Sequence, residues 1–404
     1  MSTSLLYHAF GIRGYRYCRT DYIEGEVLFT IEQSRHRLRC PCCNSTQVIA
    51  HGEVPRVFRG LPIGSKPTHV LFPIPRVECP ACGVTRQVAV PFADPKKHYT
   101  HAFERYVLEL SAHMTIQDVA RHLDISWDTV KDIQKKDLKQ HFSKPKLRKL
   151  RQIAIDEIAV AKGQRYLTVV LDLVSGAVVF VGDGKGADAL DPFWKRLRSS
   201  RGKIKAVATD MSLAYILAVR EYLPKAIHVF DHFHVIKLFN EKLSDFRREL
   251  YREATEGLAK EILKGTRWLL LKNPENLDPK RNERERLEEA LRMNKPLATV
   301  YYMKEDLRQI WQQADKATAR RVMQDWIRRA EASGIKMLQK FAATLALYRA
   351  GILAYYDYPI STGPLEGTNN KIKTMKRQAY GFRDMEFFKL KILALHRTKY
   401  ALVG

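Results

Sequence analysis

The spacing of hydrophobic and polar residues changes three times along the chain. Residues 1–100 contain short apolar or alternating runs such as VLFTIE, THVLFPI and RQVAVPF, which are typical of β-strands. Prolines interrupt this region repeatedly, and their frequency excludes a long helix. These prolines are Pro41, Pro55, Pro62, Pro67, Pro73, Pro75, Pro80, Pro91 and Pro95. The first hundred residues are therefore expected to fold into short strands and turns.

Residues 102–142 change to helical spacing, in the three runs AFERYVLELSAHM, TIQDVARHL and SWDTVKDIQKKDLKQHF. The last two runs fit a helix-turn-helix, with Ala120 allowing a close crossing, a turn at Asp124, and Ser126 as N-cap of the second helix. The positions expected to point inward are Ile116, Val119, Val130 and Ile133. Those expected to face the major groove of DNA are Trp127, Thr129, Lys131 and Lys135. An ordinary helical hairpin with a solvated basic face is the alternative.

A basic stretch follows, because residues 131–151 hold nine Lys or Arg and only two Asp, and Pro145 marks a linker within it. Residues 152–230 then return to strands. Three consecutive runs, QIAIDEIAVA, RYLTVVLDLV and GAVVFVGDG, predict a meander. A helix over 187–200, the strand IKAVATD, a helix over 212–222 and the strand AIHVFD come next. This is the element order of a ribonuclease-H-like α/β fold, although many α/β domains alternate in the same way.

From 232 to about 356 the pattern is almost wholly helical, and residues 357–365 (DYPISTGPL) break it before a final basic helix. The 404 residues include 69 Lys and Arg against 44 Asp and Glu, a net charge of +25. Nucleic acid is the expected partner for such an excess. No apolar run reaches the roughly 18–20 residues of a membrane span, and no signal pattern opens the chain. We therefore expect a soluble cytoplasmic protein without membrane association.

Four of the six cysteines form two C-P-x-C pairs, Cys40 with Cys43 and Cys79 with Cys82. In a reducing compartment this spacing indicates metal binding rather than disulfides. Two such pairs give four thiolates around one ion with no open position, so the sequence predicts one structural Zn²⁺. Free thiols that fall into this spacing by chance are the alternative.

The other cysteines and nearby histidines are weaker candidates. Cys42 is an alternative to Cys43, but the matching register of the two pairs favours Cys43. Cys18 has no partner in the sequence, and we expect it to be buried. His51 and His69 lie between the pairs and are expected to be surface or hydrogen-bonded residues rather than ligands.

Acidic residues at two strand positions suggest a catalytic site. Asp156 interrupts the apolar strand AIDEIAV, and Asp210 ends the strand AVATD; in a ribonuclease-H-like fold these positions are adjacent. Glu366, in PLEGTNNKIK, is the best candidate for a third acid from a later helix. Such carboxylates hold two divalent ions in phosphodiester chemistry, and Mg²⁺ suits them. Alone, Asp210 is also explained as a helix N-cap and Glu366 as a first-turn acid, and Glu157 and Asp172 compete.

Several motifs together resemble bacterial insertion-sequence transposases of the ISL3 family. They are the run PISTGPLEGTNNKIKTMKRQAYGFRDMEFF at 359–388, the strand IDEIA, VATDMS, HVFDHFHV and the paired C-P-x-C motifs. The resemblance covers essentially the whole chain. It implies a catalytic triad of DDE type formed by Asp156, Asp210 and Glu366, and an all-α insertion before the last acid.

On this resemblance the fold is multidomain α+β. A β-rich zinc ribbon at 1–100 precedes a helix-turn-helix and basic linker at 101–150. The first part of a ribonuclease-H-like catalytic domain, 151–235, is followed by the all-α insertion at 236–356. The last part of the catalytic domain, with the basic C-terminal helix, is 357–404.

Two further assignments follow from the resemblance. Asp231 and His234 have the D-x2-H spacing found near the active sites of transposases with helical insertions, although a cap and a packed histidine would give the same pattern. Trp268, in GTRWLLLKNPENL, resembles an insertion-domain tryptophan that stacks on a displaced base; a core tryptophan is the alternative.

The C-terminal stretch 371–399 holds nine Lys or Arg and two acids directly after Glu366. Lys373, Lys376 and Arg377 are neighbours on a helix, and with Lys371 they are expected to contact DNA phosphates beside the active site.

The predicted function is that of a DNA transposase. It would bind the terminal inverted repeats of an insertion sequence, cleave at the element ends and join the freed 3′-hydroxyl to target DNA. Two Mg²⁺ (or Mn²⁺) per active site and one structural Zn²⁺ are the expected cofactors, and synapsis of two ends requires at least a homodimer. A ribonuclease-H-like nuclease or resolvase, and a non-catalytic zinc-ribbon and helix-turn-helix regulator, are the alternatives.

Overall fold

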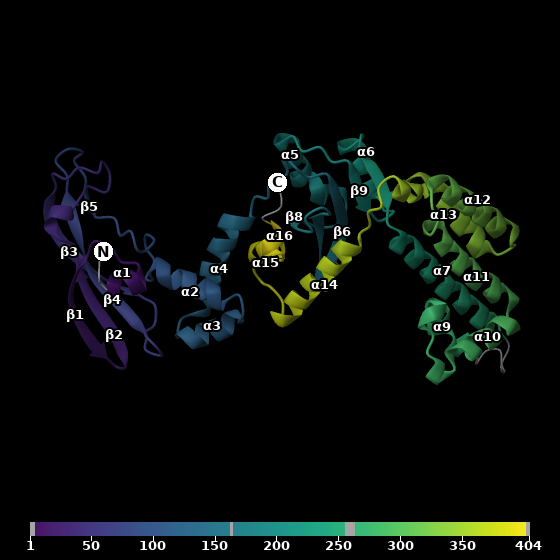
Figure 1. The fold of residues 1–404 in the computed structure, drawn as a ribbon, viewed down its shortest axis with the longest axis horizontal. Coiled ribbons are helices and arrows are strands. Elements are labelled where there is room, and N and C mark those ends of the chain that lie inside the picture. Colours follow the sequence, from purple (N-terminus) through teal and green to yellow (C-terminus); the bar gives the residue numbers. More distant parts are fainter. Residues whose placement is uncertain (1–4, 162–164, 255–262, 401–404) are drawn as a thin grey trace. The chain divides into compact units, whose positions relative to one another are not determined.

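The computed structural model describes residues 5–161, 165–254 and 263–400, which divide into two compact units, residues 1–140 and 141–404 (Figure 1). Each unit has its own hydrophobic core. The two are described separately below.

The first unit begins with a short helix, α1 (Leu5–Phe10), and a five-stranded sheet. The strands are β1 (Arg16–Ile23), β2 (Glu26–Glu32), β3 (Ile49–Arg59), β4 (Thr68–Glu78) and β5 (Thr85–Gln87), in the order β1-β2-β4-β3 with β5 also on β4. Alternate residues of β4 are buried, including Phe72 and Ile74, which gives the sheet one apolar face.

β3 and β4 are longer than the short strands expected from the prolines. Pro55 and Pro73 lie directly opposite each other in this antiparallel pair. Because proline has no N–H, two opposite prolines are compatible only with a pair that exchanges no backbone hydrogen bonds, and the ladder continues on either side. The prolines therefore do not end these strands.

Three helices follow: α2 (His101–Leu110), α3 (Ile116–Leu123) and α4 (Trp127–Phe142). Asp124 ends α3 in a left-handed conformation (φ 50°), and the Ser126 hydroxyl accepts the Thr129 N–H at 3.1 Å to cap α4. Val130 and Ile133 are fully buried against α3. The predicted helix-turn-helix is confirmed, including its cap.

The second unit contains a sheet in the order β10-β9-β6-β7-β8. Its strands are β6 (Gln152–Ala161), β7 (Arg165–Asp172), β8 (Val178–Asp183), β9 (Ala206–Thr209) and β10 (Ile227–Phe230). The first three are antiparallel neighbours, whereas β9 and β10 run parallel to β6. A meander extended by two parallel strands on the far side of its first strand is the ribonuclease-H-like topology that the element order predicted.

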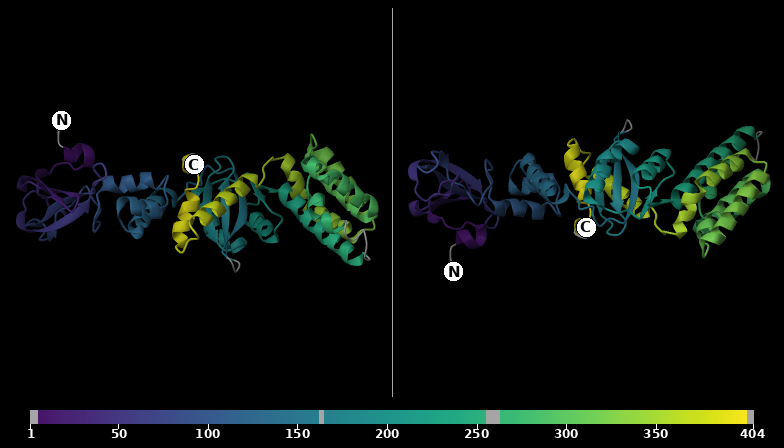
Figure 2. Two further views of the ribbon diagram at one scale, coloured as in Figure 1. Left: turned by 90° about the horizontal axis from the view of Figure 1, so that it is seen from below. Right: turned by 90° about the horizontal axis from the view of Figure 1, so that it is seen from above.

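Helices cover both faces of this sheet. α5 (Asp191–Ser200) and α6 (Leu213–Tyr222) pack on one face, where Ile153, Ile155 and Val207 point. α14 (Gly363–Gln378) and α15 (Met385–Leu393) pack on the other, against Ala154 and Ala208 (Figure 2). A short helix, α16 (Arg397–Tyr400), follows. Side chains alternate along a strand, so odd positions of β6 face α5 and α6, and even positions face α14.

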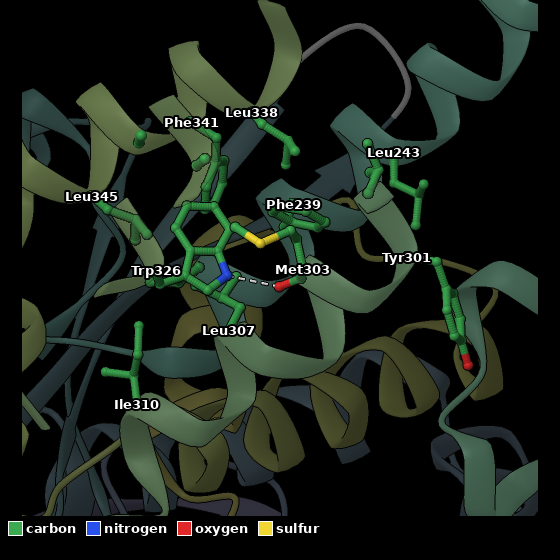
Figure 3. Packing of buried hydrophobic residues seen from close by; sticks show 14 of the residues in the cluster. Phe239, Leu243, Tyr301, Met303, Leu307, Ile310, Trp326, Leu338, Phe341 and Leu345 are labelled. Atoms are coloured by element: carbon green, nitrogen blue, oxygen red, sulfur yellow. Dashed lines mark hydrogen bonds between the residues drawn. The ribbon is translucent and has the colours of Figure 1, made fainter. Parts of the chain in front are cut away.

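The helical insertion lies between β10 and α14. It contains α7 (His232–Glu253), α9 (Arg267–Leu271), α10 (Glu283–Met293), α11 (Lys295–Arg308), α12 (Lys316–Ala332) and α13 (Lys336–Leu353). Figure 3 shows its core, where Phe239, Trp326 and Phe341 meet edge to face and the Trp326 indole donates to the Met303 carbonyl at 2.8 Å. No helix in the described part of the chain is long and apolar enough to cross a membrane.

Candidate active site and cysteine cluster

The ligand sulfurs of Cys40, Cys43, Cys79 and Cys82 all lie within 4.8 Å of one another. The Cys40 and Cys82 sulfurs are 3.5 Å apart, as are those of Cys43 and Cys79. A disulfide needs about 2.05 Å, so these are not bonded pairs. Tetrahedral zinc with Zn–S bonds of about 2.3 Å separates its sulfurs by about 3.8 Å. The four thiols are therefore spaced for a single zinc ion.

The backbone around the two pairs is the same. The N–H of Cys40 donates to the Ser45 carbonyl at 2.9 Å, and that of Cys79 donates to the Val84 carbonyl at 2.9 Å. Each turn then closes through a residue with positive φ, Asn44 in the first and Gly83 in the second. The two matching turns each present two thiols toward the same point, and this arrangement fits structural zinc.

Local hydrogen bonds favour the thiolate form of Cys40, whereas burial raises the pKa of the Cys82 thiol. The backbone N–H groups of Cys43 and Cys42 lower the pKa of Cys40 to about 6, and the Cys42 N–H lies 3.4 Å from the Cys40 sulfur. Metal binding requires the thiolate form, so such N–H donors assist it. Cys42 itself is exposed and stands outside the four-sulfur group.

The expectation that Cys18 is buried is wrong. Cys18 is exposed because it lies on β1, an edge strand whose side chains are mostly in solvent. Its sulfur lies 3.5 Å from a Glu32 carboxylate oxygen. His51 is exposed, and His69 pairs with Glu26 at 3.2 Å, so both agree with the surface or hydrogen-bonded role expected of them.

In the second unit, strand register aligns three aspartates at one edge of the sheet. Ala154 of β6 pairs with Ala208 of β9, and extending this register by two residues brings Asp156 level with Asp210, whose charge acts on it. Residues just before Asp210 pair in turn with the end of β10, which places Asp231 next in the same row. Parallel strands end at the same edge, so the row forms at their carboxyl ends.

Asp156 is half-buried, on the sheet face covered by α14. Its Oδ1 accepts the Glu157 N–H at 2.8 Å, and its Oδ2 accepts the side-chain amide of Asn369 at 2.9 Å. Burial raises the pKa of Asp156, and the negative charge of Asp210 raises it further, whereas His234 acts in the opposite direction. The carboxylate is therefore held where its charge is incompletely compensated.

Glu366 lies in the first turn of α14, one turn before Asn369, so the two share a helix face. Leu365 and Ile372 seat this helix on the sheet beside Ala154 and Ala208. The Glu366 side chain is exposed. Within the described residues, the four cysteines form the only group of three or more His, Cys, Asp or Glu whose ligand atoms lie within 4.8 Å of one another. Asp156, Asp210 and Glu366 therefore lie on the same side of the sheet without being packed together.

Glu157 and Asp172, the alternative candidates for the catalytic acids, lie away from Asp156 and have other partners. Glu157 points to the opposite sheet face, where its carboxylate accepts the Tyr215 hydroxyl at 2.7 Å and the Gly186 N–H at 3.2 Å. Asp172 caps the β7–β8 turn by accepting the Val174 N–H at 3.2 Å. Each carboxylate therefore has a structural role away from Asp156.

Asp231 joins the two ends of the helical insertion. Its side chain is 2% exposed, caps α7 through the Phe233 N–H at 3.2 Å, and accepts both the N–H and the hydroxyl of Thr362. Burial alone would raise the pKa of Asp231, but hydrogen bonds from His232 and Thr362 hold it below its usual value. The cap is thus present, and an auxiliary catalytic role for Asp231 and His234 stays a prediction.

Asn369 and Thr362 were not identified from the sequence. Both donate a hydrogen bond to an aspartate of the row, Asn369 to Asp156 and Thr362 to Asp231. Only their spacing from Glu366, one helical turn on either side, could have indicated them.

The residues expected to contact DNA differ in exposure. On α4, Trp127 is 43% exposed and Lys131 lies 5.6 Å above its ring. Thr129 and Lys135 are half-buried, and the Thr129 hydroxyl bonds to that of Ser126. In the insertion, Trp268 is 65% exposed beneath the Arg267 guanidinium, so it lies outside the core.

The C-terminal basic residues of α14 differ in their contacts. Lys371 lies 3.1 Å from His396, and Arg377 contacts Thr374. Lys373 is exposed. Lys376 donates to the Val160 carbonyl at 3.0 Å, which fixes α14 to the end of β6.

Comparison with known families divides the chain into three consecutive segments. Residues 36–82 match the "zinc-finger of transposase IS204/IS1001/IS1096/IS1165", and residues 88–137 match the "Helix-turn-helix domain of transposase family ISL3". Residues 153–392 match the DDE-type ISL3 family described as "Transposase". The last match covers more than half of the chain and includes the entire acid row.

Relatives that match most of the chain are also transposases of insertion sequences. The transposase for insertion sequence element IS1001 of Bordetella parapertussis is 35% identical over 95% of this chain and 96% of its own. The transposase for insertion sequence element IS1557 of Mycobacterium tuberculosis (strain ATCC 25618 / H37Rv) is 30% identical over 81% of this chain and 78% of its own. A chain of the Drosophila P element transposase strand transfer complex matches 74% of this chain and 92% of its own length, at 9% identity and with a TM-score of 0.40. The chain therefore belongs to the ISL3 family of transposases.

Proposed function

We propose that this protein is the transposase of an insertion sequence, which binds the terminal inverted repeats, cleaves at the element ends and joins the 3′-hydroxyl to target DNA. The proposal is supported by the parallel register, which brings Asp156 level with Asp210 near the carboxyl ends of β6 and β9, and by α14, which packs on the same sheet face and holds Glu366 in its first turn. Three acids from three separate elements then serve one site.

The donor set fits hard divalent cations. Carboxylate oxygens are the ligands that Mg²⁺ and Mn²⁺ prefer. Burial, and to a smaller extent the charge of Asp210, raises the pKa of Asp156, and a bound cation would offset this cost to the ionised carboxylate. Asp156, Asp210 and Glu366 would hold two ions. When bound, such ions activate the attacking oxygen and stabilise the leaving oxygen of a phosphodiester.

Other residues of the chain keep this site in position. Asn369 donates to one Asp156 oxygen, which fixes the carboxylate while its other oxygen accepts a backbone N–H. The Asp231–Thr362 bond anchors the segment just before α14, and the Glu366 N–H donates to the Thr362 carbonyl at 2.8 Å. His234 lies near enough to Asp156 to lower the pKa of that carboxyl.

DNA recognition is assigned to the first unit. Exposed Trp127 and neighbouring Lys131 open α4, which is the position of base-contacting residues on a recognition helix. The cysteine cluster would be closed by one structural Zn²⁺. Synapsis of two element ends requires at least a homodimer, and Lys371, Lys373 and Arg377 would contact phosphates beside the site.

The test is nicking and strand transfer on end DNA by Asp156→Asn, Asp210→Asn and Glu366→Gln. Each should abolish both activities while end binding persists or tightens, because negative charge next to phosphate is removed. Glu157→Gln is the matched control, since this acid faces the other side of the sheet. Near-normal strand transfer by any triad variant would remove that residue from the site.

Two outcomes would favour the other functions. Metal-dependent nicking without strand joining by the unmodified protein would indicate a nuclease or resolvase. Specific binding with no nicking under any metal would indicate a regulator. The same assays therefore separate all three functions.

A further inference from the structure

A second basic feature of the catalytic unit is separate from the acid row. A cavity of about 700 Å³ is lined by Arg148, Lys149, Arg151, Arg201 and Lys203. All five are cationic, and four of them are exposed while Arg151 is half-buried. Within the described residues none of the five pairs with a carboxylate, so the cavity has uncompensated positive charge.

The fold places these residues at the end of the sheet opposite the acids. Residues 148–151 lead into β6, and residues 201–203 lie on the path from α5 to β9. Because β6 and β9 are parallel, both segments enter the sheet from its amino end. Five positions of extended strand separate Arg151 from Asp156, about 16 Å at 3.3 Å per residue.

The two segments are held together by backbone contacts. The N–H groups of Lys205 and Ala206 both donate to the Arg151 carbonyl, at 2.6 and 3.2 Å. A Cβ on Gly202 would lie 2.6 Å from the Leu147 carbonyl oxygen, so only glycine allows this approach. The basic side chains therefore project from a preformed frame.

We propose that this basic cavity binds backbone phosphates of duplex DNA at a distance from the scissile phosphate. Like charges gathered without acids repel one another until an anion enters, and phosphates of a duplex supply several anions at close spacing. Lys and Arg alone carry no base readout here, so the contact is independent of sequence. It also gives a role to the end of the basic stretch at 131–151. The proposal rests on the proposed function, since DNA is taken as the partner.

The test compares Lys149→Ala/Lys203→Ala with the unmodified full-length protein in duplex DNA binding at several salt concentrations. Both lysines are exposed, so melting temperature should not change. Loss of two phosphate contacts should reduce the slope of log K against log salt by about 1.8. The matched control is Lys336→Ala/Lys340→Ala, which removes the same charge from exposed positions on α13.

An unchanged slope, or an equal reduction in the control, would overturn the proposal. Inorganic phosphate provides a second arm: if it raises the melting temperature of the unmodified protein but not of the cavity variant, while the DNA slope is unchanged, the cavity binds small anions instead. Nicking at saturating DNA separates this result from the proposed function. The cavity variant should nick normally there, whereas failure of the triad assignment would appear in the triad variants alone.

Discussion

The bond between Asp231 and Thr362 gives the sharpest test of how the acid site is supported. The two residues are separated by 131 positions, and the helical insertion lies between them. Each is only 2% exposed, so water cannot replace a lost partner. Thr362→Val keeps the shape of the side chain but removes the hydroxyl that donates to the carboxylate.

The expected cost follows from the charge of the acceptor. A hydrogen bond to an ionised group contributes about 1.5–3 kcal/mol, and the Thr362 N–H still donates after the change. We therefore expect Thr362→Val to lower the free energy of unfolding of the second unit by about 2 kcal/mol. Thr362→Ser retains the hydroxyl and loses one methyl group, about 0.8 kcal/mol, so it is the control.

The assay is urea unfolding of the full-length protein, with the transition of the second unit followed separately. The depressed pKa of Asp231 means that its stabilisation is present above the ordinary aspartate pKa and is lost as pH falls through the folded-state pKa. The difference between the valine and serine variants should thus be full at pH 7 and shrink in acid. Equal stability of the two variants at pH 7 would refute the reasoning.

Three further outcomes are expected. Metal analysis should find about one zinc per chain, and Cys79→Ser with Cys82→Ser should remove it; zinc retained by that variant would exclude the site. Because burial raises the pKa of Asp156, metal-free protein should gain stability as pH falls through that pKa toward its ordinary value, and Asp156→Asn should remove this dependence; an identical pH profile would contradict it. Trp268→Ala should change the free energy of unfolding by less than about 0.5 kcal/mol, since the side chain is exposed. It should nevertheless slow end processing by loss of a stacking interaction of about 1–3 kcal/mol, and normal processing would exclude stacking.

Local periodicity was sufficient for the helix-turn-helix and for the order of strands. Side chains alternate along β6, so its two acids lie on opposite faces of the sheet. Asp156 shares a face with Ala154, whereas Glu157 lies on the reverse face. The alignment of Asp156 with Asp210 follows from parallel register, which the predicted topology implies.

Long-range contacts were not predictable in the same way. The Asn369–Asp156 bond and the Lys376–Val160 bond each join residues more than 200 positions apart. Their existence depends on how α14 crosses the sheet, which no local pattern specifies. Exposure of Cys18 was missed for a related reason, because the sequence does not state which strand lies at the edge of a sheet.

The split of the catalytic domain also has a consequence in time. Because 156 positions separate Asp210 from Glu366, a ribosome adding about 5–20 residues per second needs roughly 8–30 s to pass from one acid to the other. During that interval the sheet face bearing Ala154 and Ala208 awaits the helix that will cover it. The first unit is complete before then, so a nascent chain acquires its helix-turn-helix long before Glu366, and the order of synthesis itself delays assembly of the proposed acid site.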